Sequence, residues 1–243
     1  MISIQDLSFA FSKQRLVLQG ITCRIPAGSC LCLAGGNGSG KSTLLALLAG
    51  LYTPLQGRIN IFGVSSPGDQ PQLRQLCAIL LQDADLQILG GTVAEDILLG
   101  CKGDAKLLEQ RARRLAKGFG LLKYWEHPVQ QLSGGEKKKL CLAGALMHAP
   151  KLILFDEPFN NLDYFGLNEL RQIMARQKEA GITQIISTHD LEPILDLADE
   201  IAVLEQGRLA CKESPEFVLD QLQEFGVRTP CAWRLEKKLS SWG

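Results

Sequence analysis

The stretch Gly35-Gly36-Asn37-Gly38-Ser39-Gly40-Lys41-Ser42 decides the fold of this 243-residue chain. It matches the pattern G-x-x-x-x-G-K-[ST] and lies between an apolar run, residues 30–34, and a helical pattern that begins at Lys41. A strand, a glycine-rich loop and a helix in this order predict the opening of a nucleotide-binding α/β domain. The alternative, a glycine-rich turn without a ligand, does not account for all three parts being in register.

Each part of this stretch has a physical role in holding phosphate. Glycines allow successive backbone N–H groups to turn toward phosphate oxygens, and the helix N-terminus adds its partial positive charge. Lys41 is expected to reach the β- and γ-phosphates, and Ser42 is expected to bind Mg²⁺. The predicted nucleotide-binding residues of this segment are Gly35, Gly36, Asn37, Gly38, Ser39, Gly40, Lys41, Ser42 and Thr43.

Two carboxylates follow a second apolar strand, residues 152–155. Ligands bind at the carboxyl edge of a parallel sheet, where Asp156 and Glu157 would lie. Asp156 would hold Mg²⁺ through its water shell, and Glu157 would polarise a water molecule for attack on the γ-phosphate. A strand followed by acids is common by itself, but together with the glycine-rich loop it predicts a nucleoside triphosphate hydrolase.

A second candidate anion site is the segment Leu132-Ser133-Gly134-Gly135-Glu136, which precedes an apolar helical stretch. Ser133 and Glu136 also fit a capping box, which is the purely structural interpretation. The two glycines, however, would expose backbone N–H groups at a helix N-terminus. Because the loop at residues 35–42 already serves the ATP bound to this chain, this segment predicts an ATP shared with another subunit.

The predicted fold class is α/β: a P-loop NTPase core with a mostly parallel sheet, an antiparallel β lead-in, a helical insertion subdomain and a short C-terminal helical extension. We expect a single domain over residues 1–243, with the core at 1–82 and 151–212, the helical subdomain at 83–150 and the extension at 213–243. The individual predictions are strands at 3–9, 17–25, 30–34, 152–155 and 183–188, helices at 104–123 and 164–180, a hairpin at 201–211, and two short tail helices split at Gly226 and Pro230. The apolar face expected for the helix at 104–123 consists of Leu107, Leu108, Leu115, Phe119 and Leu122.

Composition excludes several classes of protein. Lys+Arg and Asp+Glu are both 26, so no global basic field exists to bind nucleic acid. No apolar run approaches the roughly 20 residues of a membrane-spanning helix, and residues 1–6 do not resemble a secretory signal, so a cytosolic location is expected. The 8 cysteines include no C-x-x-C pair and are expected to be mostly reduced core residues.

Taken together, these motifs resemble the ATP-binding cassette (ABC) family, and the resemblance runs over essentially the whole chain. The segment 132–136 is similar to the signature motif of that family, with Glu136 where glutamine is usual. Gln82 at the loop joining the core to the helical subdomain, Asn161-Leu162-Asp163 after the acids and His189 at a strand end follow the family order. Phe11 resembles the aromatic residue that stacks on adenine, with an ordinary core Phe as the alternative.

The resemblance implies that two such domains meet head to tail and enclose two ATP molecules. One subunit would supply the catalytic residues Glu157, His189, Gln82 and Lys41, with Mg²⁺ bound at Ser42, Gln82 and Asp156. The other subunit would supply the signature residues Leu132, Ser133, Gly134, Gly135 and Glu136, while Asp163 would link the two sites. Hydrolysis of ATP would then drive a cycle of closing and opening.

One branch of the family is favoured by the segment 81–97, in which Gln82, Asp85, Gln87, Val93, Glu95 and Asp96 resemble the energy-coupling-factor and cobalt-type importers. The tail segment 225–230 agrees, whereas Ala84 and Phe159-Asn160 depart from the usual pattern. Thr92 and Glu95 also fit a capping box.

This resemblance implies an ATPase subunit at the cytoplasmic face of a membrane, working for the import of a vitamin or of cobalt or nickel. Its partners would be a second ABC ATPase, an integral membrane coupling subunit and often a small substrate-capturing membrane protein, with no nucleic acid. The alternatives are a soluble ABC ATPase without a membrane partner and the ATPase subunit of an exporter. Lys137, Lys138 and Lys139 fit either contact with a partner or an ordinary solvated helix face.

Overall fold

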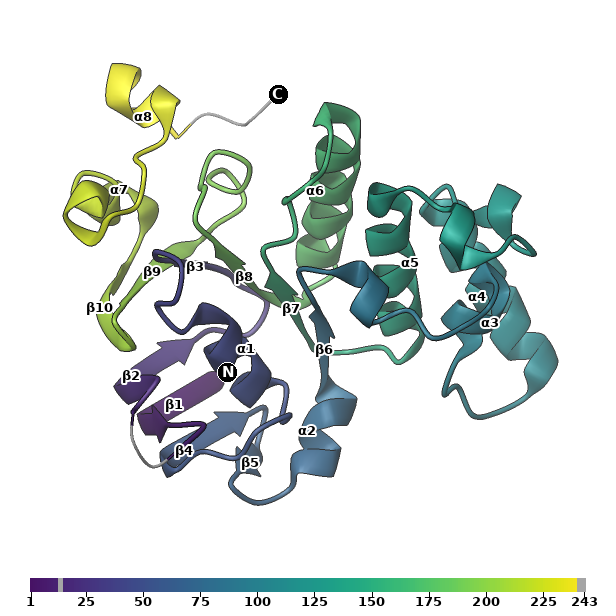
Figure 1. The fold of residues 1–243 in the computed structure, drawn as a ribbon, viewed down its shortest axis with the longest axis horizontal. Coiled ribbons are helices and arrows are strands. Elements are labelled where there is room, and N and C mark those ends of the chain that lie inside the picture. Colours follow the sequence, from purple (N-terminus) through teal and green to yellow (C-terminus); the bar gives the residue numbers. More distant parts are fainter. Residues whose placement is uncertain (13–14, 240–243) are drawn as a thin grey trace.

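The computed structural model describes residues 1–12 and 15–239, and the strands in this part of the chain form two sheets (Figure 1). The larger sheet has the order β10-β9-β3-β8-β7-β6. Its strands are β3 (Cys30–Ala34), β6 (Cys77–Leu80), β7 (Leu152–Asp156), β8 (Thr183–Thr188), β9 (Glu200–Glu205) and β10 (Arg208–Glu213). Neighbouring strands are parallel, except that β10 pairs with β9 in the antiparallel sense. The mostly parallel sheet predicted from the sequence is therefore confirmed.

The central strand β3 is buried along its whole length, as its continuous apolar sequence predicts. Successive side chains of a strand point to opposite faces. Leu31 and Leu33 accordingly pack into the hydrophobic cluster on one side of the sheet, and Cys30, Cys32 and Ala34 pack into the cluster on the other. The large sheet is thus packed on both faces by hydrophobic clusters. This packing holds the carboxyl edge of the sheet in a fixed position.

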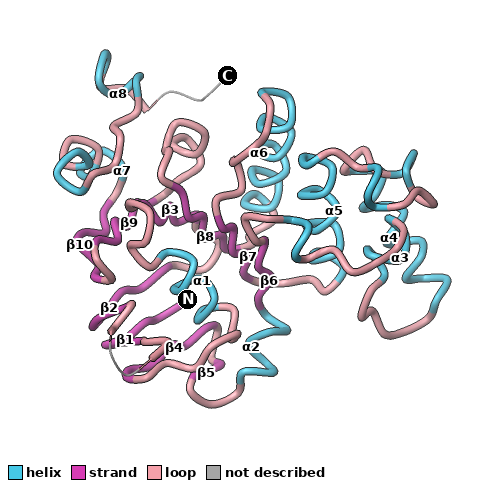
Figure 2. The backbone as a smooth tube through the Cα atoms, in the orientation of Figure 1, coloured by secondary structure: helices cyan, strands magenta, loops and turns pink. Residues whose placement is uncertain are grey.

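The smaller sheet is antiparallel and has the order β2-β1-β4-β5 (Figure 2). Its strands are β1 (Ile2–Phe9), β2 (Leu18–Ile25), β4 (Gln56–Ile61) and β5 (Val64–Ser66). The antiparallel lead-in is confirmed, but the hairpin of β4 and β5 was not predicted. Helix α1 (Lys41–Leu48) lies between the two sheets, and its buried leucines share one cluster with Ile4 and Ile59 of the small sheet and Leu31 of the large one.

Helices dominate residues 83–149, as predicted. They are η1 (Ala84–Leu86), α3 (Val93–Leu98), α4 (Ala105–Gly118), η2 (Leu122–Tyr124), η3 (Val129–Gln131) and α5 (Gly134–Met147). The prediction for α4 was partly wrong, because the helix ends at Gly118 and Gly120 has a left-handed φ of +70°. Its buried positions are Ala112 and Ala116, whereas Leu107 is 66 % exposed. Small side chains allow α4 to lie close to the helices beneath it. Of the predicted apolar residues, Phe119 is buried in the core cluster and Leu108 and Leu115 pack against it, so the predicted face is confirmed in part.

The remaining helices lie outside the segment 83–149 (Figure 1). They are α2 (Gln70–Leu76), α6 (Tyr164–Glu179), α7 (Pro215–Val218), η4 (Leu222–Phe225) and α8 (Cys231–Glu236). The predicted helix between β7 and β8, the β9–β10 hairpin and the short tail helices are all confirmed. Within the described residues, none of the helices combines the length and apolar character needed to cross a bilayer. The division into core, helical subdomain and extension stays a prediction.

Candidate functional site

The loop between β3 and α1 depends on two glycines with left-handed backbone. Gly40 caps α1 at φ +106°, and a Cβ there would lie 2.7 Å from the side chain of Leu18. At Gly35, with φ +151°, a Cβ would lie 2.3 Å from the carbonyl oxygen of Leu204 on β9. Because the Leu204 carbonyl is backbone and cannot turn aside, glycine at position 35 allows the loop to pack directly against β9.

Lys41 begins α1 and turns its ammonium group back across the loop. Nζ donates hydrogen bonds to the carbonyl oxygens of Gly35 at 2.8 Å and Gly36 at 3.1 Å. It also lies 3.6 Å from Oε1 of Glu157, and both side chains are buried. The lysine charge is therefore held at the mouth of the loop, where the phosphates of a nucleotide would enter.

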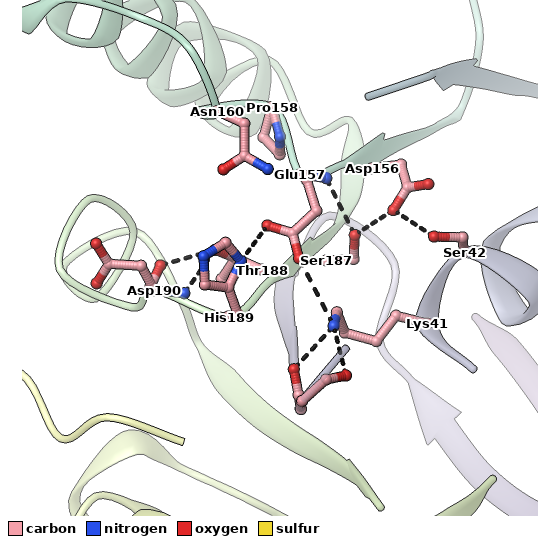
Figure 3. A network of polar contacts seen from close by, with 12 residues as sticks. Lys41, Ser42, Asp156, Glu157, Pro158, Asn160, Ser187, Thr188, His189 and Asp190 are labelled. Atoms are coloured by element: carbon pink, nitrogen blue, oxygen red, sulfur yellow. Dashed lines mark hydrogen bonds and ion pairs between the residues drawn. The ribbon is translucent and has the colours of Figure 1, made fainter. Parts of the chain in front are cut away.

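Asp156, at the end of β7, accepts two hydroxyl hydrogen bonds on the same oxygen. Ser42 Oγ donates to Oδ1 at 3.0 Å, and Ser187 Oγ donates to it at 2.6 Å (Figure 3). Ser42 comes from α1 and Ser187 from β8, so three elements meet at this carboxylate. The sequence predicted Ser42 and Asp156 as a pair, and the structure brings them into direct contact.

Glu157 follows directly and is 7 % exposed, with a left-handed φ of +46°. Its backbone N–H donates to Ser187, to both the carbonyl oxygen and Oγ, at 3.1 Å each. Its Oε2 lies 2.9 Å from Nδ1 of His189, which follows β8 (Figure 3). The unusual backbone turns the carboxylate from the sheet edge toward Lys41 and His189.

These side chains border a cavity of about 390 Å³. Gln82, which is exposed, reaches the same cavity from the loop after β6. The lining residues are Val17, Asn37, Gly38, Ser39, Gly40, Lys41, Ser42, Thr43, Gln82, Glu157, Asn160 and His189. The structure thus brings most of the predicted nucleotide and catalytic residues to one cavity.

Phe11 is not among those lining residues. It is 63 % exposed and belongs to an aromatic cluster, in which its ring centroid lies 5.0 Å from that of Phe9 and 5.5 Å from that of Tyr52. Both contacts are edge-to-face. The alternative of an ordinary core phenylalanine is wrong, whereas stacking on adenine stays a prediction.

The chemistry of the cavity fits a nucleotide with a magnesium ion. Ser39 Oγ is buried, and no described residue supplies it with a hydrogen-bond partner, which leaves a polar group in the loop available to a ligand. The hydroxyl of Ser42 and the carboxylate of Asp156 are hard oxygen donors, the type that Mg²⁺ prefers. Both groups lie next to the cavity where phosphate oxygens would complete the coordination.

The predicted signature residues lie elsewhere, around a separate hollow of about 690 Å³. Ser133 caps α5, and both halves of its capping box with Glu136 are present. The Ser133 hydroxyl also donates to Glu136 Oε2 at 2.9 Å. Burial favours a higher pKa for Glu136, but hydrogen bonds from Ser133 and Tyr124 and the nearby charge of Lys139 together lower the pKa overall. Asp163 lines the same hollow, which shares no lining residue with the first cavity.

The three lysines after the signature segment do not form a solvated face, so that interpretation was wrong. Lys137 pairs with Asp85 and Lys139 pairs with Glu169, at 2.6 Å and 2.7 Å. Lys138 is 8 % exposed. All three are therefore occupied by contacts within the chain.

Sequence reasoning missed several residues of the site. Ser187 is the second hydroxyl donor to Asp156, and Asn160 lines the nucleotide cavity. Lys138 contacts the loop after Glu157. A polar residue on a buried strand, as at Ser187, was the one available signal, because such a hydroxyl must find a partner.

A mostly parallel sheet with a glycine-rich loop after β3, a lysine at the loop mouth and two acids at the end of β7 define a P-loop nucleoside triphosphatase. The chain belongs to the ABC transporter family, whose model matches residues 18–160. It is an ATP-binding ATPase of that family, so the resemblance inferred from the sequence is confirmed.

Relatives and a solved structure support this assignment. The chain is 33% identical to the energy-coupling factor transporter ATP-binding protein EcfA of Carboxydothermus hydrogenoformans, over 96% of this chain and 89% of the relative. It is 32% identical to the cobalt import ATP-binding protein CbiO of Syntrophus aciditrophicus, over 98% and 89%. The structure of cbiO1 from Clostridium perfringens, part of the ABC transporter complex cbiONQ, matches with a TM-score of 0.82 and 28% identity over 98% of each chain.

Proposed function

We propose that the chain is the ATP-hydrolysing subunit of a membrane importer for a micronutrient, a vitamin or a cobalt or nickel ion. Its relatives carry the names energy-coupling factor transporter and cobalt import ATP-binding protein, and the similarity covers nearly the whole of each chain. The segment 81–97, which favoured this branch, contains η1 and most of α3, and its residue Gln82 lines the nucleotide cavity. The substrate would be recognised by other subunits of such an importer.

The contact network around the cavity is the observation that carries the catalytic part of this proposal. The phosphates of ATP would lie on the loop at residues 35–42, with Lys41 at the β- and γ-phosphates. Glu157 would polarise the attacking water, and His189 would contact the γ-phosphate while holding Oε2 of Glu157 at 2.9 Å. Phe11 would stack on the adenine.

Mg²⁺ would be held by Ser42, Gln82 and Asp156. The ion would neutralise charge on the β- and γ-phosphate oxygens and fix their orientation. Ser187 would keep the Asp156 carboxylate in place when Ser42 turns from it toward the ion. Gln82 would connect the site to the segment 83–97, so binding of ATP and Mg²⁺ would change the position of that segment.

A second ATPase subunit would complete each site. In one chain the signature residues and the nucleotide cavity occupy separate hollows, which supports a pair arranged head to tail around two ATP molecules. Ser133, Gly134 and Gly135 of one subunit would then contact the γ-phosphate bound by the other, and Asp163 would link the sites. Leu132 is 5 % exposed and would act by packing. The pair would close on binding ATP and open after hydrolysis.

An integral membrane coupling subunit would be the further partner, with or without a small substrate-capturing protein. Leu86 and Leu89 are exposed near the Gln82 loop, at 74% and 77%, and offer an apolar surface to a helix of that subunit. The chain would accordingly lie at the cytoplasmic face of the membrane as a peripheral subunit.

Affinity purification of the tagged chain from detergent-solubilised membranes of its host, followed by mass spectrometry, tests the proposal. We expect a near-stoichiometric integral membrane protein, and we expect the double variant Leu86→Glu, Leu89→Glu to lose it while still binding ATP. Recovery of soluble partners alone would favour a soluble ABC ATPase instead. Recovery of an export permease would favour the exporter alternative.

A further inference from the structure

Lys138 lies on α5, one turn after the signature residue Gly134, and its side chain points into the protein. Its ammonium group donates to the carbonyl oxygen of Pro158 at 2.7 Å and to that of Asn160 at 2.6 Å. Both acceptors belong to the segment that follows Glu157, where Figure 3 shows Pro158 and Asn160. A single side chain therefore joins the signature helix to the backbone next to the candidate base.

The environment of Lys138 is unusual for a cation. The residue is 8 % exposed, and burial lowers the pKa of its ammonium group. Within residues 1–12 and 15–239 no acidic side chain forms an ion pair with it. Burying a charge without an opposite charge costs free energy, and an apolar residue of similar length would avoid that cost. A stabilising role alone thus accounts poorly for a lysine at this position.

The segment that Lys138 contacts is shaped by tight local geometry. It begins at Glu157 with φ +46° and ends at Asn161 with φ +60°. The N–H of Asn160 donates back to the carbonyl oxygen of Glu157 at 3.3 Å, and Asn160 lines the nucleotide cavity. The two carbonyls bound by Lys138 lie within this turn, so a displacement of α5 would shift the turn.

We propose that Lys138 is a positioning residue that couples the signature helix to the turn carrying Glu157 and Asn160. The inference rests on the proposed function, in which Ser133, Gly134 and Gly135 engage the ATP of a partner subunit. Engagement there would set the position of α5, and Lys138 would transmit that position to the chain's own base. Each subunit's catalytic turn would thereby respond to the ATP at the opposite site.

The test compares Lys138→Met with Lys138→Gln in the protein purified with its partners. The two replacement side chains are similar in size, but only glutamine retains N–H donors for the two carbonyls. We expect the methionine variant to lose about ten- to a hundredfold in kcat, because a small misplacement of a catalytic group is costly. Its affinity for a fluorescent ATP analogue should stay within about twofold, and the glutamine variant should recover much of kcat.

Hydrogen exchange of the backbone amides at residues 157–163 provides a second readout that requires no turnover. Exchange should accelerate in the order wild type, Lys138→Gln, Lys138→Met. Because this measurement is independent of hydrolysis, it tests whether Lys138 holds the turn separately from the ATPase proposal. Should the methionine variant not fold, the glutamine variant is compared with the wild type instead. We expect a smaller increase in exchange at residues 157–163 in that comparison.

Lys178→Met is the matched control. Lys178 on α6 also donates to a carbonyl, that of Leu197 at 2.8 Å, and lies outside the nucleotide and signature residues. Its loss should leave kcat and exchange at 157–163 unchanged. The inference is overturned if Lys138→Met keeps wild-type kcat and exchange, if ATP affinity falls in parallel with kcat, or if the glutamine and methionine variants behave alike.

Discussion

The two carboxylate oxygens of Glu157 have different partners, and this division defines how the residue can act. Oε1 lies 3.6 Å from the Lys41 ammonium, and Oε2 lies 2.9 Å from the His189 ring. A general base needs a fixed lone pair near the water that it polarises. Lys41 and His189 hold the two oxygens of Glu157, as its proposed role as the base in ATP hydrolysis requires.

Glu157→Gln should retain ATP binding while turnover falls at least about a hundredfold, because the amide has the same shape but cannot accept the proton. Nucleotide affinity and steady-state hydrolysis, measured on the same preparation, check this expectation. Glu109→Gln on the exposed surface of α4 is the control and should behave as wild type. Hydrolysis that survives in Glu157→Gln would show that another group is the base.

The thiols should differ widely in reactivity. Burial raises the pKa of Cys30, Cys77 and Cys141 to about 12, whereas Cys231 is exposed. Because the thiolate is the reactive form, the buried thiols stay protonated and inert at pH 8. Iodoacetamide labelling followed by peptide mass spectrometry should find Cys231 modified first, and the buried Cys30 and Cys141 only after unfolding in urea. Labelling of Cys141 at the rate of Cys231 would contradict the buried environment.

At the scale of elements, α4 depends on its first turn. Asp104 caps the helix by accepting from the N–H of Leu107 at 2.9 Å. Asp104→Ala should therefore lower the free energy of unfolding by about 1 kcal/mol, measured by urea denaturation. Glu109→Ala, which removes an exposed pair with Arg113, should cost only about 0.3–0.5 kcal/mol. Equal losses in the two variants would argue against the cap.

The hydrophobic pattern of the sequence predicted those elements whose pattern fits only a strand or only a helix. Residues 30–34 are apolar throughout and form the buried strand β3, and the helix at 164–180 was found almost to the residue. The hairpin of β4 and β5 was missed because half of β4 is exposed, which gives a weak alternating pattern. The inner face of α4 was predicted only in part, because the fully buried positions are alanines, beside which Leu108 and Leu115 are only partly buried.

The candidate site was predictable to the extent that each residue belongs to a local motif. Lys41, Ser42, Asp156 and Glu157 follow from loop and strand-end chemistry, and the structure brings them together. Lys138 could not be recognised, because its partners are backbone carbonyls more than a helix away in the sequence. Backbone acceptors carry no residue signature, so contacts of this kind emerge only from the fold.

At the scale of the whole molecule, the described residues form two separate hollows, which in the proposed function are the two halves of a composite site. The cavity of about 390 Å³ and the signature hollow of about 690 Å³ have no residue in common. The proposed pair would join each cavity to the hollow of the other subunit. Neither half-site should therefore be sufficient for hydrolysis. A variant damaged in the cavity and a variant damaged in the signature hollow should restore activity when they are mixed.

Lys41→Ala and Gly135→Asp should each abolish turnover in pairs of this chain. Mixing the two variants should restore measurable turnover, at most about a quarter of wild-type activity, because about half of the pairs become mixed and each mixed pair has one intact composite site without a working opposite site. Steady-state hydrolysis across mixing ratios measures this recovery. Mixing Lys41→Ala with Glu157→Gln is the control, since both damage the same half-site. A mixture as inactive as its components would contradict a site shared between two copies.

The strand order of the large sheet has a consequence for the synthesis of the chain. Cys30 pairs with Gln184, and β3 lies between β8 and β9, both of which are translated long after it. The antiparallel pair of β1 and β2 is local and needs no such wait. We expect the nascent chain to fold its small sheet early and to carry the unpaired β3 with its two thiols until β8 leaves the ribosome. In that interval β3 is exposed and can pair with the wrong strand, so we expect chaperones to bind the nascent chain mainly at β3.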